Sequence, residues 1–534
     1  MNDRGDHWQR VKQFLIHDES LGFSLDVSRM AFEEDFLDGM EPAAQKALAC
    51  MAELETGAQA NPDENRMVGH YWLRDPSLAP GKTIPEMIES TIEHIQQFSK
   101  HLHEAQVRGE RSLPFQQFLL IGIGGSALGP QLLADALGSQ QDRLHPWFID
   151  NTDPDGIHRT LAALTDRLDQ TLVVVISKSG GTKETRNGLI ETRAAYEKAG
   201  LGFPAHAVAV TGKGSALERQ AQQEGWLEVF PMWDWVGGRT SVCSPVGLLP
   251  MALQGLRIDR FLEGARSMDA LTRRQDVAGN PALMMALMWY WAGQGRGLRD
   301  LVILPYKDRL VLLGRYLQQL IMESLGKERD LQGNLVHQGL VVYGNKGSTD
   351  QHAYIQQLRE GPNNFFVTFI EVQGESFEDV AAAQVEVEHG ITSGDYLGGF
   401  LLGTRDALSE NGRDSMTLTF RRLNAFTLGS LIALFERTVG FYATMINVNP
   451  YHQPGVEAGK KAAQAVIDLQ GRLLGRMEGD PRQLTAEQWA ETLGEPQQAE
   501  RIFKILDRLS ACPGRGIQRT GGPTPGEATY TRKG

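Results

Sequence analysis

Cysteine is scarce in this chain: Cys50, Cys243 and Cys512 are the only three among 534 residues. They are widely separated and odd in number, and no Cys-x-x-Cys pair occurs, so the sequence indicates neither a disulfide framework nor a zinc-finger pattern. The first residues lack the apolar core of a signal peptide, and no run approaches the ~20 apolar residues of a membrane span. We therefore expect a cytoplasmic protein without a membrane segment.

Positive charge is also in deficit. The chain has 53 Lys and Arg against 66 Asp and Glu, a formal net charge of −13. Nucleic-acid affinity comes from Lys and Arg gathered against phosphates, so this balance argues against a nucleic-acid partner. Local groups can still hold a small anion. With 41% hydrophobic and 22% charged residues, the composition is that of a globular protein with about two or three domains.

Short apolar runs separated by helix-like segments indicate an α/β fold with mainly parallel sheets. A second, similar series of runs begins after the glycine-rich break at residues 293–297. The sequence therefore predicts two doubly wound units in tandem, with ligands bound where the carboxyl ends of strands meet loops. The predicted strands are Phe118–Ile121, Trp147–Ile149, Leu172–Ile176 and Val208–Val210 in the first unit, and Leu301–Leu304, Leu340–Tyr343, Phe365–Ile370 and Ser415–Phe420 in the second.

Four parts are expected along the chain. The predicted ranges are an N-terminal helical arm at 1–110, a first α/β domain at 111–293, a second at 294–475, and a C-terminal helical extension at 476–534. Residues from Pro513 onward are rich in Gly, Pro and Thr, so we expect a flexible tail without regular structure there.

The glycine-rich loop Gly122–Gly129 follows the first predicted strand and precedes a helix. Its order fits the dinucleotide fingerprint G-x-G-x-x-A, and Asp150, after the next strand, suits the acid that binds a ribose. The same glycines also suit a simpler role, in which backbone amides at a helix start approach any anion or hydroxyl. The pattern alone leaves both interpretations open.

The loop Ser177-Lys178-Ser179-Gly180-Gly181-Thr182 favours a phosphate site. It follows a predicted strand and opens a helix, so hydroxyls and amides gather where the helix dipole attracts an anion. N-capping by Thr182 explains one hydroxyl but not Ser177, Ser179 and two glycines. The Walker order Gly-x-x-x-x-Gly-Lys-Ser/Thr is absent, which disfavours hydrolysis of nucleoside triphosphates.

Two further segments carry an arginine and a carboxylate suited to proton transfer. Arg239 follows two glycines, an arrangement that can aim a permanent cation into a cleft. Glu323 lies near the C-terminal end of a predicted helix at 309–325, and Gln319 shares its face four residues earlier. His352 and Lys460 follow in separate segments. Each of these side chains alone has an ordinary explanation as a solvated or structural group, so the interpretation depends on their occurring together.

Taken in order, these segments resemble the motifs of the glucose-6-phosphate isomerase family, in particular its bacterial type. The resemblance covers residues 60–470, and six motifs in order make it specific. The motifs are Ile121-Gly122-Ile123-Gly124-Gly125-Ser126, Ser177-Lys178-Ser179-Gly180-Gly181-Thr182-Lys183-Glu184-Thr185, Val236-Gly237-Gly238-Arg239-Thr240-Ser241, Met322-Glu323-Ser324-Leu325-Gly326-Lys327, Gln351-His352-Ala353 and Gln453-Pro454-Gly455-Val456-Glu457.

The resemblance implies two sugar-isomerase (SIS) domains, each a three-layer α/β/α sandwich, in a homodimer. It implies reversible conversion of D-glucose 6-phosphate into D-fructose 6-phosphate, in glycolysis and gluconeogenesis, through ring opening and a cis-enediol(ate). The family needs neither a cofactor nor a metal. A fixed cation beside the developing oxyanion supplies the electrostatic help that a metal gives other isomerases.

The same resemblance implies a role for each residue. Glu323 moves the proton between C1 and C2, and Arg239 stabilises the enediolate. His352, reaching the site from the neighbouring subunit, and Lys460 assist ring opening. The residues implied to bind the sugar and its phosphate are Gly125, Ser126, Ser177, Lys178, Ser179, Thr182, Gln319 and Gln453.

Two positions depart from the commoner family pattern. Gly180-Gly181 stands where an apolar residue and a threonine are frequent, and Pro454 stands where tryptophan is common. These two departures leave the fine substrate preference open, but they do not change the reaction that the resemblance implies. Two other functions remain alternatives: a sugar-phosphate sensor, which has no need of the base Glu323, and an NAD-linked dehydrogenase, which the early glycine loop allows.

Overall fold

Five parallel strands form the first large sheet of the computed structural model, which describes residues 4–33, 35–376 and 385–533. They are β3 (Gln117–Ile121), β4 (His145–Ile149), β5 (Thr171–Ser177), β6 (Ala207–Gly212) and β7 (Glu228–Met232). Strand β5 is buried along its whole length and rich in valine, as a strand covered on both faces requires. The order β4-β3-β5-β6-β7 reverses direction between β3 and β5, which makes that point a switch point suited to ligands.

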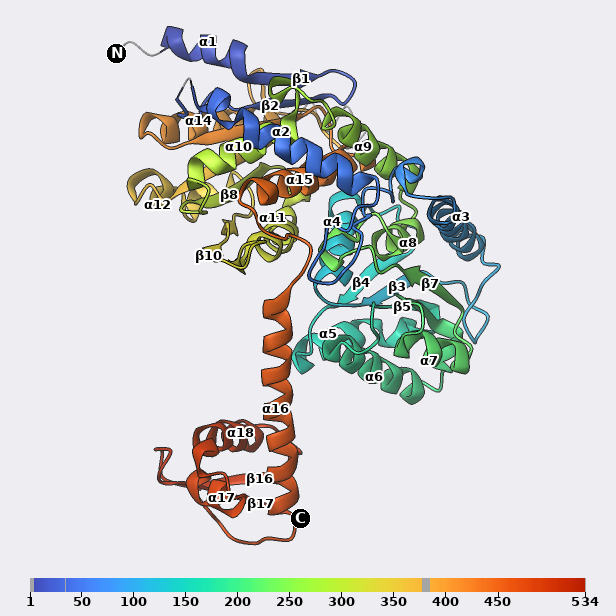
Figure 1. Cartoon of the computed structure of the whole chain (residues 1–534). Helices are drawn as coiled ribbons and strands as arrows, with labels where there is room; N and C mark the ends of the chain where they lie inside the picture. The colour runs from blue at the N-terminus through green and yellow to red at the C-terminus, as the bar shows by residue number, and fades with distance from the viewer. Residues whose placement is uncertain (1–3, 34, 377–384, 534) are drawn as a thin grey trace. The chain divides into compact units, whose positions relative to one another are not determined.

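Helices cover both faces of this sheet (Figure 1). On β3, Leu119 and Ile121 join one buried cluster, while Phe118 and Leu120 face another. The first cluster includes residues of α5 (Pro154–Leu164), α6 (Lys183–Lys198) and α7 (Ala216–Glu224). The second includes residues of α3 (Thr83–His103), α4 (Leu128–Leu137) and α8 (Pro245–Gln254). The predicted three-layer α/β/α arrangement is confirmed for this region.

The second large sheet repeats the order of four neighbouring strands of the first, β4-β3-β5-β6, and adds two strands at one edge. It has six strands in the order β1-β2-β15-β12-β8-β11, of which the last four are parallel. In chain order these four follow the pattern of the first sheet, so the prediction of two similar units in tandem is confirmed. The strands are β1 (Leu15–Asp18), β2 (Phe23–Asp26), β8 (Asp300–Tyr306), β11 (Val342–Tyr343), β12 (Phe365–Val372) and β15 (Ser415–Phe420).

Strands β1 and β2 come from the N-terminal region that the sequence predicted to be mostly helical. Their hairpin pairs antiparallel with β15 and extends the second sheet, so this region contributes strands as well as helices. Phe23 and Leu25 on β2 are fully buried, which explains why the hairpin docks on the sheet. The other elements are α1 (Arg4–Phe14), α2 (Phe36–Glu55), α9 (Ile258–Leu271), α10 (Pro281–Gly293), α11 (Leu313–Leu317), α12 (Ile355–Glu360), α14 (Ser393–Glu410) and α15 (Ala425–Met445), and the hairpins β9 (Lys327–Arg329) with β10 (Leu335–Gln338) and β13 (Glu386–Glu388) with β14 (Ile391–Thr392).

Helix α15 is buried on all sides and packs against α2, α9 and α10. Its start is fixed by Asn424, whose side-chain oxygen accepts a hydrogen bond from the backbone N–H of Thr427 at 3.0 Å. Among the helices of residues 4–33, 35–376 and 385–533, none has the length and apolar character needed to cross a membrane.

Residues 453–534 form a separate compact unit, and residues up to His452 form the other. The second unit contains α16 (Pro454–Met477), α17 (Ala486–Thr492), α18 (Ala499–Ala511), β16 (Ile517–Gly521) and β17 (Ala528–Arg532). The expectation that residues from Pro513 onward lack regular structure is wrong, because β16 and β17 form an antiparallel hairpin. Tyr530 is fully buried, and its carbonyl accepts a hydrogen bond from the indole of Trp489 at 3.0 Å. A buried aromatic anchor outweighs the Gly- and Pro-rich composition.

Candidate active site

The glycine loop after β3 lies against the Gly-Gly-Arg turn. A Cβ added to Gly125 would lie only 2.1 Å from the carbonyl oxygen of Gly238, so the two backbones approach too closely for any side chain. The hydroxyl of Ser241 donates to the carbonyl of Gly125 at 3.4 Å. Packing between two loops of the chain therefore explains this glycine without a dinucleotide. Asp150, the predicted ribose acid, instead accepts a hydrogen bond from Gln131 at 2.9 Å.

The loop after β5 lies beside the switch point and opens the 16-residue helix α6. Ser177 is buried at the end of the strand, and its Oγ accepts the backbone N–H of Gly180 at 3.2 Å. Ser179 accepts the N–H of Gly181 at 3.1 Å. Thr182 stands at the N-cap of α6 but makes no capping hydrogen bond. The structure thus places three hydroxyls together at a helix N-terminus, where an anion is favoured.

Lys178 belongs to the same loop, but its ammonium is engaged elsewhere. Its Nζ donates to the carbonyls of Asp234 at 3.2 Å and Val236 at 3.0 Å. Burial lowers the pKa of Lys178, while the carboxylate of Asp234 opposes that change. In this structure Lys178 holds the segment leading into the Gly-Gly-Arg turn, and its predicted contact with substrate stays a prediction.

Arg239 and Glu323 form the centre of the site. The Nε of Arg239 lies 3.1 Å from Oε2 of Glu323, and their side chains are 5% and 18% exposed. The same guanidinium donates to the carbonyl of Pro450 at 2.6 Å and to that of His452 at 3.2 Å. Burial lowers the pKa of Arg239, and the Glu323 carboxylate opposes this shift. A permanent cation is therefore fixed beside a carboxylate that solvent can still reach.

The helix that carries Glu323 is not the continuous helix predicted at 309–325. A 3₁₀ turn, Asp308–Leu310, precedes the short α11, and a π-helical segment, Gln318–Glu323, ends at the carboxylate. π-Helical turns are rare, are widened by i→i+5 bonding, and are frequent at functional sites. Gln319 faces the first glycine loop, since its Nε2 lies 3.1 Å from the position that a Cβ would take on Gly124. The loop after β3, the Gly-Gly-Arg turn and the π-helical segment therefore converge.

Lys327 lies in the same region, although the sequence alone predicts no role for it. It is buried, and its Nζ donates to the carbonyl of Glu323 at 2.7 Å and to that of His452 at 3.2 Å. The sequence did contain a signal, because Lys327 stands four residues after the proposed base, close enough to turn back on it at the end of a helix.

His352 ends a 3₁₀ turn, Thr349–His352, and is exposed. Within the part of the chain that the structure describes, its imidazole makes no hydrogen bond or ion pair. Gln453 and Lys460 belong to the second unit, as the N-cap and an early residue of α16. Their predicted place beside Glu323 stays a prediction, as does that of His352.

Comparison with known proteins identifies the relatives of this chain. Residues 26–390 and 405–473 match the family described as phosphoglucose isomerase. The glucose-6-phosphate isomerase of Geobacter sulfurreducens is 58% identical and covers 96% of each chain, and that of a Nostoc species is 56% identical, over 94% of this chain and 95% of the relative. Among solved structures, the glucose-6-phosphate isomerase of Chlamydia trachomatis superposes with a TM-score of 0.78 at 26% identity, covering 87% of this chain and 91% of that one. The chain belongs to the phosphoglucose isomerase family.

Proposed function

We propose that this protein interconverts D-glucose 6-phosphate and D-fructose 6-phosphate, the activity for which its relatives are named. The observation that carries the proposal is the ion pair between Arg239 and Glu323, in a chain whose first sheet also has a hydroxyl-lined helix N-terminus at its switch point. A coupled assay that detects fructose 6-phosphate from glucose 6-phosphate tests it. Absence of turnover by the pure protein would contradict the proposal.

The reaction requires a base at carbon and a cation beside the oxygens. In the open-chain aldose, Glu323 takes the proton from C2, the C1 carbonyl oxygen gains negative charge, and Arg239 stabilises the resulting cis-enediolate. The proton of the C2 hydroxyl passes to the C1 oxygen, and Glu323 then delivers its proton to C1, which leaves the ketone at C2. Since the guanidinium is buried and already held by Pro450 and His452, little reorganisation is needed as the charge develops. Gly125, Ser126, Gln319 and Gln453 would bind the sugar hydroxyls.

The phosphate is proposed to bind at the start of α6, where Ser177, Ser179 and Thr182 offer hydroxyls and the helix dipole favours an anion. Lys178 lends positive charge to the same loop. With the phosphate bound here, C1 and C2 at the opposite end of the sugar would be left for Glu323. The phosphate would be bound at one place and the proton transferred at another. Binding energy from the phosphate can then orient the reacting carbons.

Replacing Thr182 with valine is expected to raise KM for glucose 6-phosphate roughly 10-fold, because a hydrogen bond to a charged group is worth more than about 1.5 kcal/mol. The inhibition constant of inorganic phosphate should rise in parallel, while kcat changes little. Since Thr182 makes no capping hydrogen bond, α6 should be unaffected. Thr165→Val, at an exposed position after α5, is the matched control, and equal KM values for the two variants would remove Thr182 from the phosphate site.

We further propose a homodimer in the cytoplasm, with His352 of one subunit and Lys460 opening the sugar ring at the site that Glu323 forms. The exposure of His352 and its lack of partners within the described chain support this arrangement. The free thiols of Cys50, Cys243 and Cys512 support a reducing compartment. In a two-fold dimer each subunit would give its histidine to the other, so both sites would depend on the interface.

Mixing two inactive variants tests this exchange. Glu323→Gln and His352→Ala, unfolded and refolded together at equal amounts, should recover roughly a quarter of wild-type activity, since half of the dimers are mixed and each mixed dimer has one intact site. Each variant refolded alone is the control. If histidine and glutamate act within one subunit, the mixture stays as inactive as its components.

A further inference from the structure

Lys327 is a buried lysine whose ammonium contacts backbone carbonyls only. It begins β9, four residues after Glu323, and its side chain turns back toward the helical segment that carries Glu323. Its Nζ donates to the carbonyl of Glu323 at 2.7 Å and to the carbonyl of His452 at 3.2 Å. Among the residues that the structure describes, no carboxylate lies within ion-pair distance of Lys327.

Such a placement is unfavourable for the fold. Burial and the neighbouring guanidinium of Arg239 lower the pKa of Lys327 to about 7, although the carboxylates of Glu323 and Asp63 act in the opposite direction. An apolar side chain at this position would avoid the loss of hydration that a buried ammonium suffers. An apolar residue here would therefore stabilise the fold more than Lys327 does. We infer that the role of this lysine lies in the two carbonyls that it binds.

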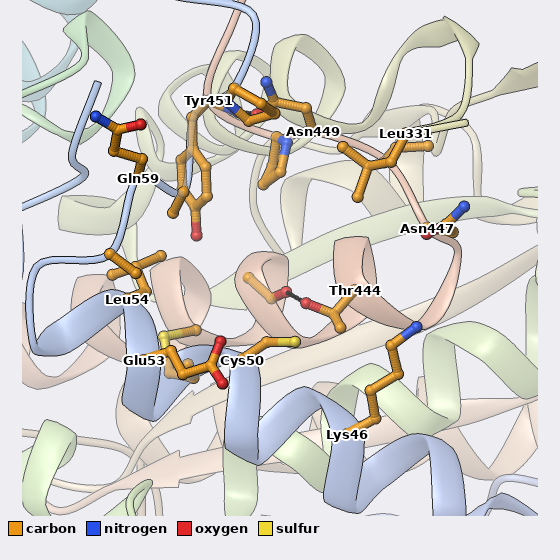
Figure 2. Close-up of a pocket in the computed structure, with 17 residues that line it drawn as sticks. Lys46, Cys50, Glu53, Leu54, Gln59, Leu331, Thr444, Asn447, Asn449 and Tyr451 are labelled. Atoms are coloured by element: carbon orange, nitrogen blue, oxygen red, sulfur yellow. Dashed lines mark hydrogen bonds between the residues drawn. The ribbon is translucent and has the colours of Figure 1, made fainter. Parts of the chain in front are cut away.

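The carbonyl of His452 is shared by Lys327 and Arg239, and Arg239 also binds the carbonyl of Pro450. Two buried cations thus hold the backbone of residues 450–452 through hydrogen bonds to its carbonyls. Behind this segment lies a cavity of about 300 Å³ (Figure 2), lined by Pro450 and Tyr451 on one side and by α2 and α15 on the other. Asn61 donates to the carbonyl of Tyr451 at 3.4 Å and the N–H of Tyr451 donates to Asn449 at 2.9 Å, while the two cations hold the carbonyls of Pro450 and His452 on either side.

We propose that Lys327 is a positioning residue for catalysis: it ties the backbone of the base Glu323 to His452, the residue that directly precedes Gln453 and the helix bearing Lys460. The inference rests on the proposed function of Glu323, Gln453 and Lys460. Lys327 touches no reacting atom. It sets the position of Glu323 relative to His452, the last residue before Gln453 and the helix that bears Lys460. A misplacement of about 1 Å can cost 10²-fold in rate.

Lys327→Met removes both hydrogen bonds and keeps an unbranched side chain that is one atom shorter. It is expected to lower kcat between about 10- and 100-fold, with KM changed less than about 3-fold, because the phosphate loop lies elsewhere. Lys327→Arg, which retains a buried cation with several donors, should recover most of the loss. The matched control is Lys100→Met on the exposed surface of α3. Thermal unfolding of each variant is followed beside the kinetics.

Three results would overturn the proposal: a wild-type kcat in Lys327→Met, a loss confined to KM, or a lower melting temperature with wild-type kcat per folded enzyme. If Lys327→Met does not fold, Lys327→Gln, which keeps an N–H donor but lacks the reach for both carbonyls, is held to the same criteria. Wild-type turnover is measured first. No turnover there contradicts the proposed function, whereas turnover that is insensitive to Lys327 contradicts only the positioning role.

Discussion

Replacing Glu323 with glutamine is expected to lower kcat at least ~10²-fold while the protein remains folded. Glutamine has nearly the same shape and still offers an oxygen to Arg239, but it cannot accept the C2 proton. Arg239 keeps the carbonyls of Pro450 and His452 as acceptors, so the guanidinium does not lose all its partners. The loss therefore concerns proton transfer. Steady-state kinetics with both hexose phosphates, in both directions, measures it.

Two further measurements separate loss of the base from loss of structure. Glu328→Gln, at an exposed position of β9 five residues away, should keep wild-type kcat and so controls for a change of local charge. In D2O, the wild-type enzyme should exchange the C2 proton of the substrate with solvent, and Glu323→Gln should lose exchange and turnover by the same factor. Undiminished turnover in Glu323→Gln would assign the base to another residue and would also favour a binding-only role for this carboxylate.

The fold could be predicted where a local pattern carried the information. Residues 415–420 alternate between polar and apolar side chains, and β15 has those bounds. Strand β2 has only four residues, and the partner that stabilises it, β15, lies far along the chain. The C-terminal hairpin likewise depends on the burial of Tyr530 against Trp489, which composition does not reveal. Tertiary contacts decided these two cases against local propensity.

The site could be predicted as residue types but not as contacts. The motifs singled out Arg239 and Glu323, and the structure brings the two side chains together. The hydrogen bonds of Lys178 and Lys327 go to backbone carbonyls, and Lys178 adds an ion pair with Asp234 at 3.7 Å. Every residue carries a carbonyl, so no pattern of side chains marks Val236 or His452 as an acceptor. The positions of these two lysines follow from the path of the backbone, which only the fold defines.

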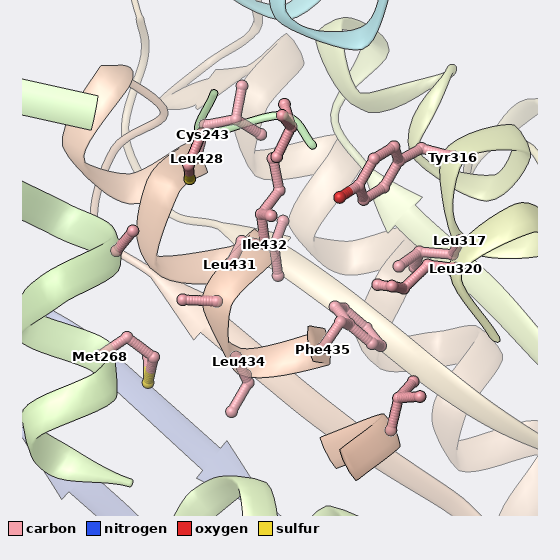
Figure 3. Packing of buried hydrophobic residues seen from close by; sticks show 14 of the residues in the cluster. Cys243, Met268, Tyr316, Leu317, Leu320, Leu428, Leu431, Ile432, Leu434 and Phe435 are labelled. Carbon is pink, nitrogen blue, oxygen red and sulfur yellow. The ribbon is translucent and has the colours of Figure 1, made fainter. Parts of the chain in front are cut away.

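A network of six charged side chains, five of them buried, links four parts of the first unit. Asp269 on α9 accepts hydrogen bonds from Arg74 at 2.5 and 2.9 Å and from Arg437 on α15 at 3.0 Å. Arg74 also pairs with Glu436, and Glu55 on α2 pairs with Arg437 and Arg273. Apolar side chains of the same helices, Met268 and Phe435 among them, form a buried cluster (Figure 3), and Arg74, Asp269, Glu436 and Arg437 are themselves buried, so their charges are shielded from water.

The protonation states of the carboxyl groups in this network follow from the balance between burial and the attraction of the arginines. Burial opposes ionisation of Asp269, but Arg74 and Arg437 outweigh it and lower its pKa. Its contribution to stability is therefore present above the ordinary carboxyl pKa and is lost as pH falls through the lowered value. Burial raises the pKa of Glu436 to about 7, against the attraction of Arg74. Asp269 is the carboxylate on which the network depends most, because both of its guanidinium partners, Arg74 and Arg437, are fully buried.

Replacing Asp269 with asparagine is expected to destabilise the first unit by about 3–5 kcal/mol, because two buried guanidinium groups lose their shared anion. Asp259→Asn, on the same helix, is the matched control. Asp259 pairs with Arg257 at 2.6 Å, but their side chains are 50% and 69% exposed, and exposed ion pairs contribute little. Urea midpoints and melting temperatures of both variants measure the difference, with the soluble yield as a third readout. Equal midpoints for Asp269→Asn and Asp259→Asn would mean that α9 and α15 are held together by apolar packing, and that the buried charges only offset their own desolvation.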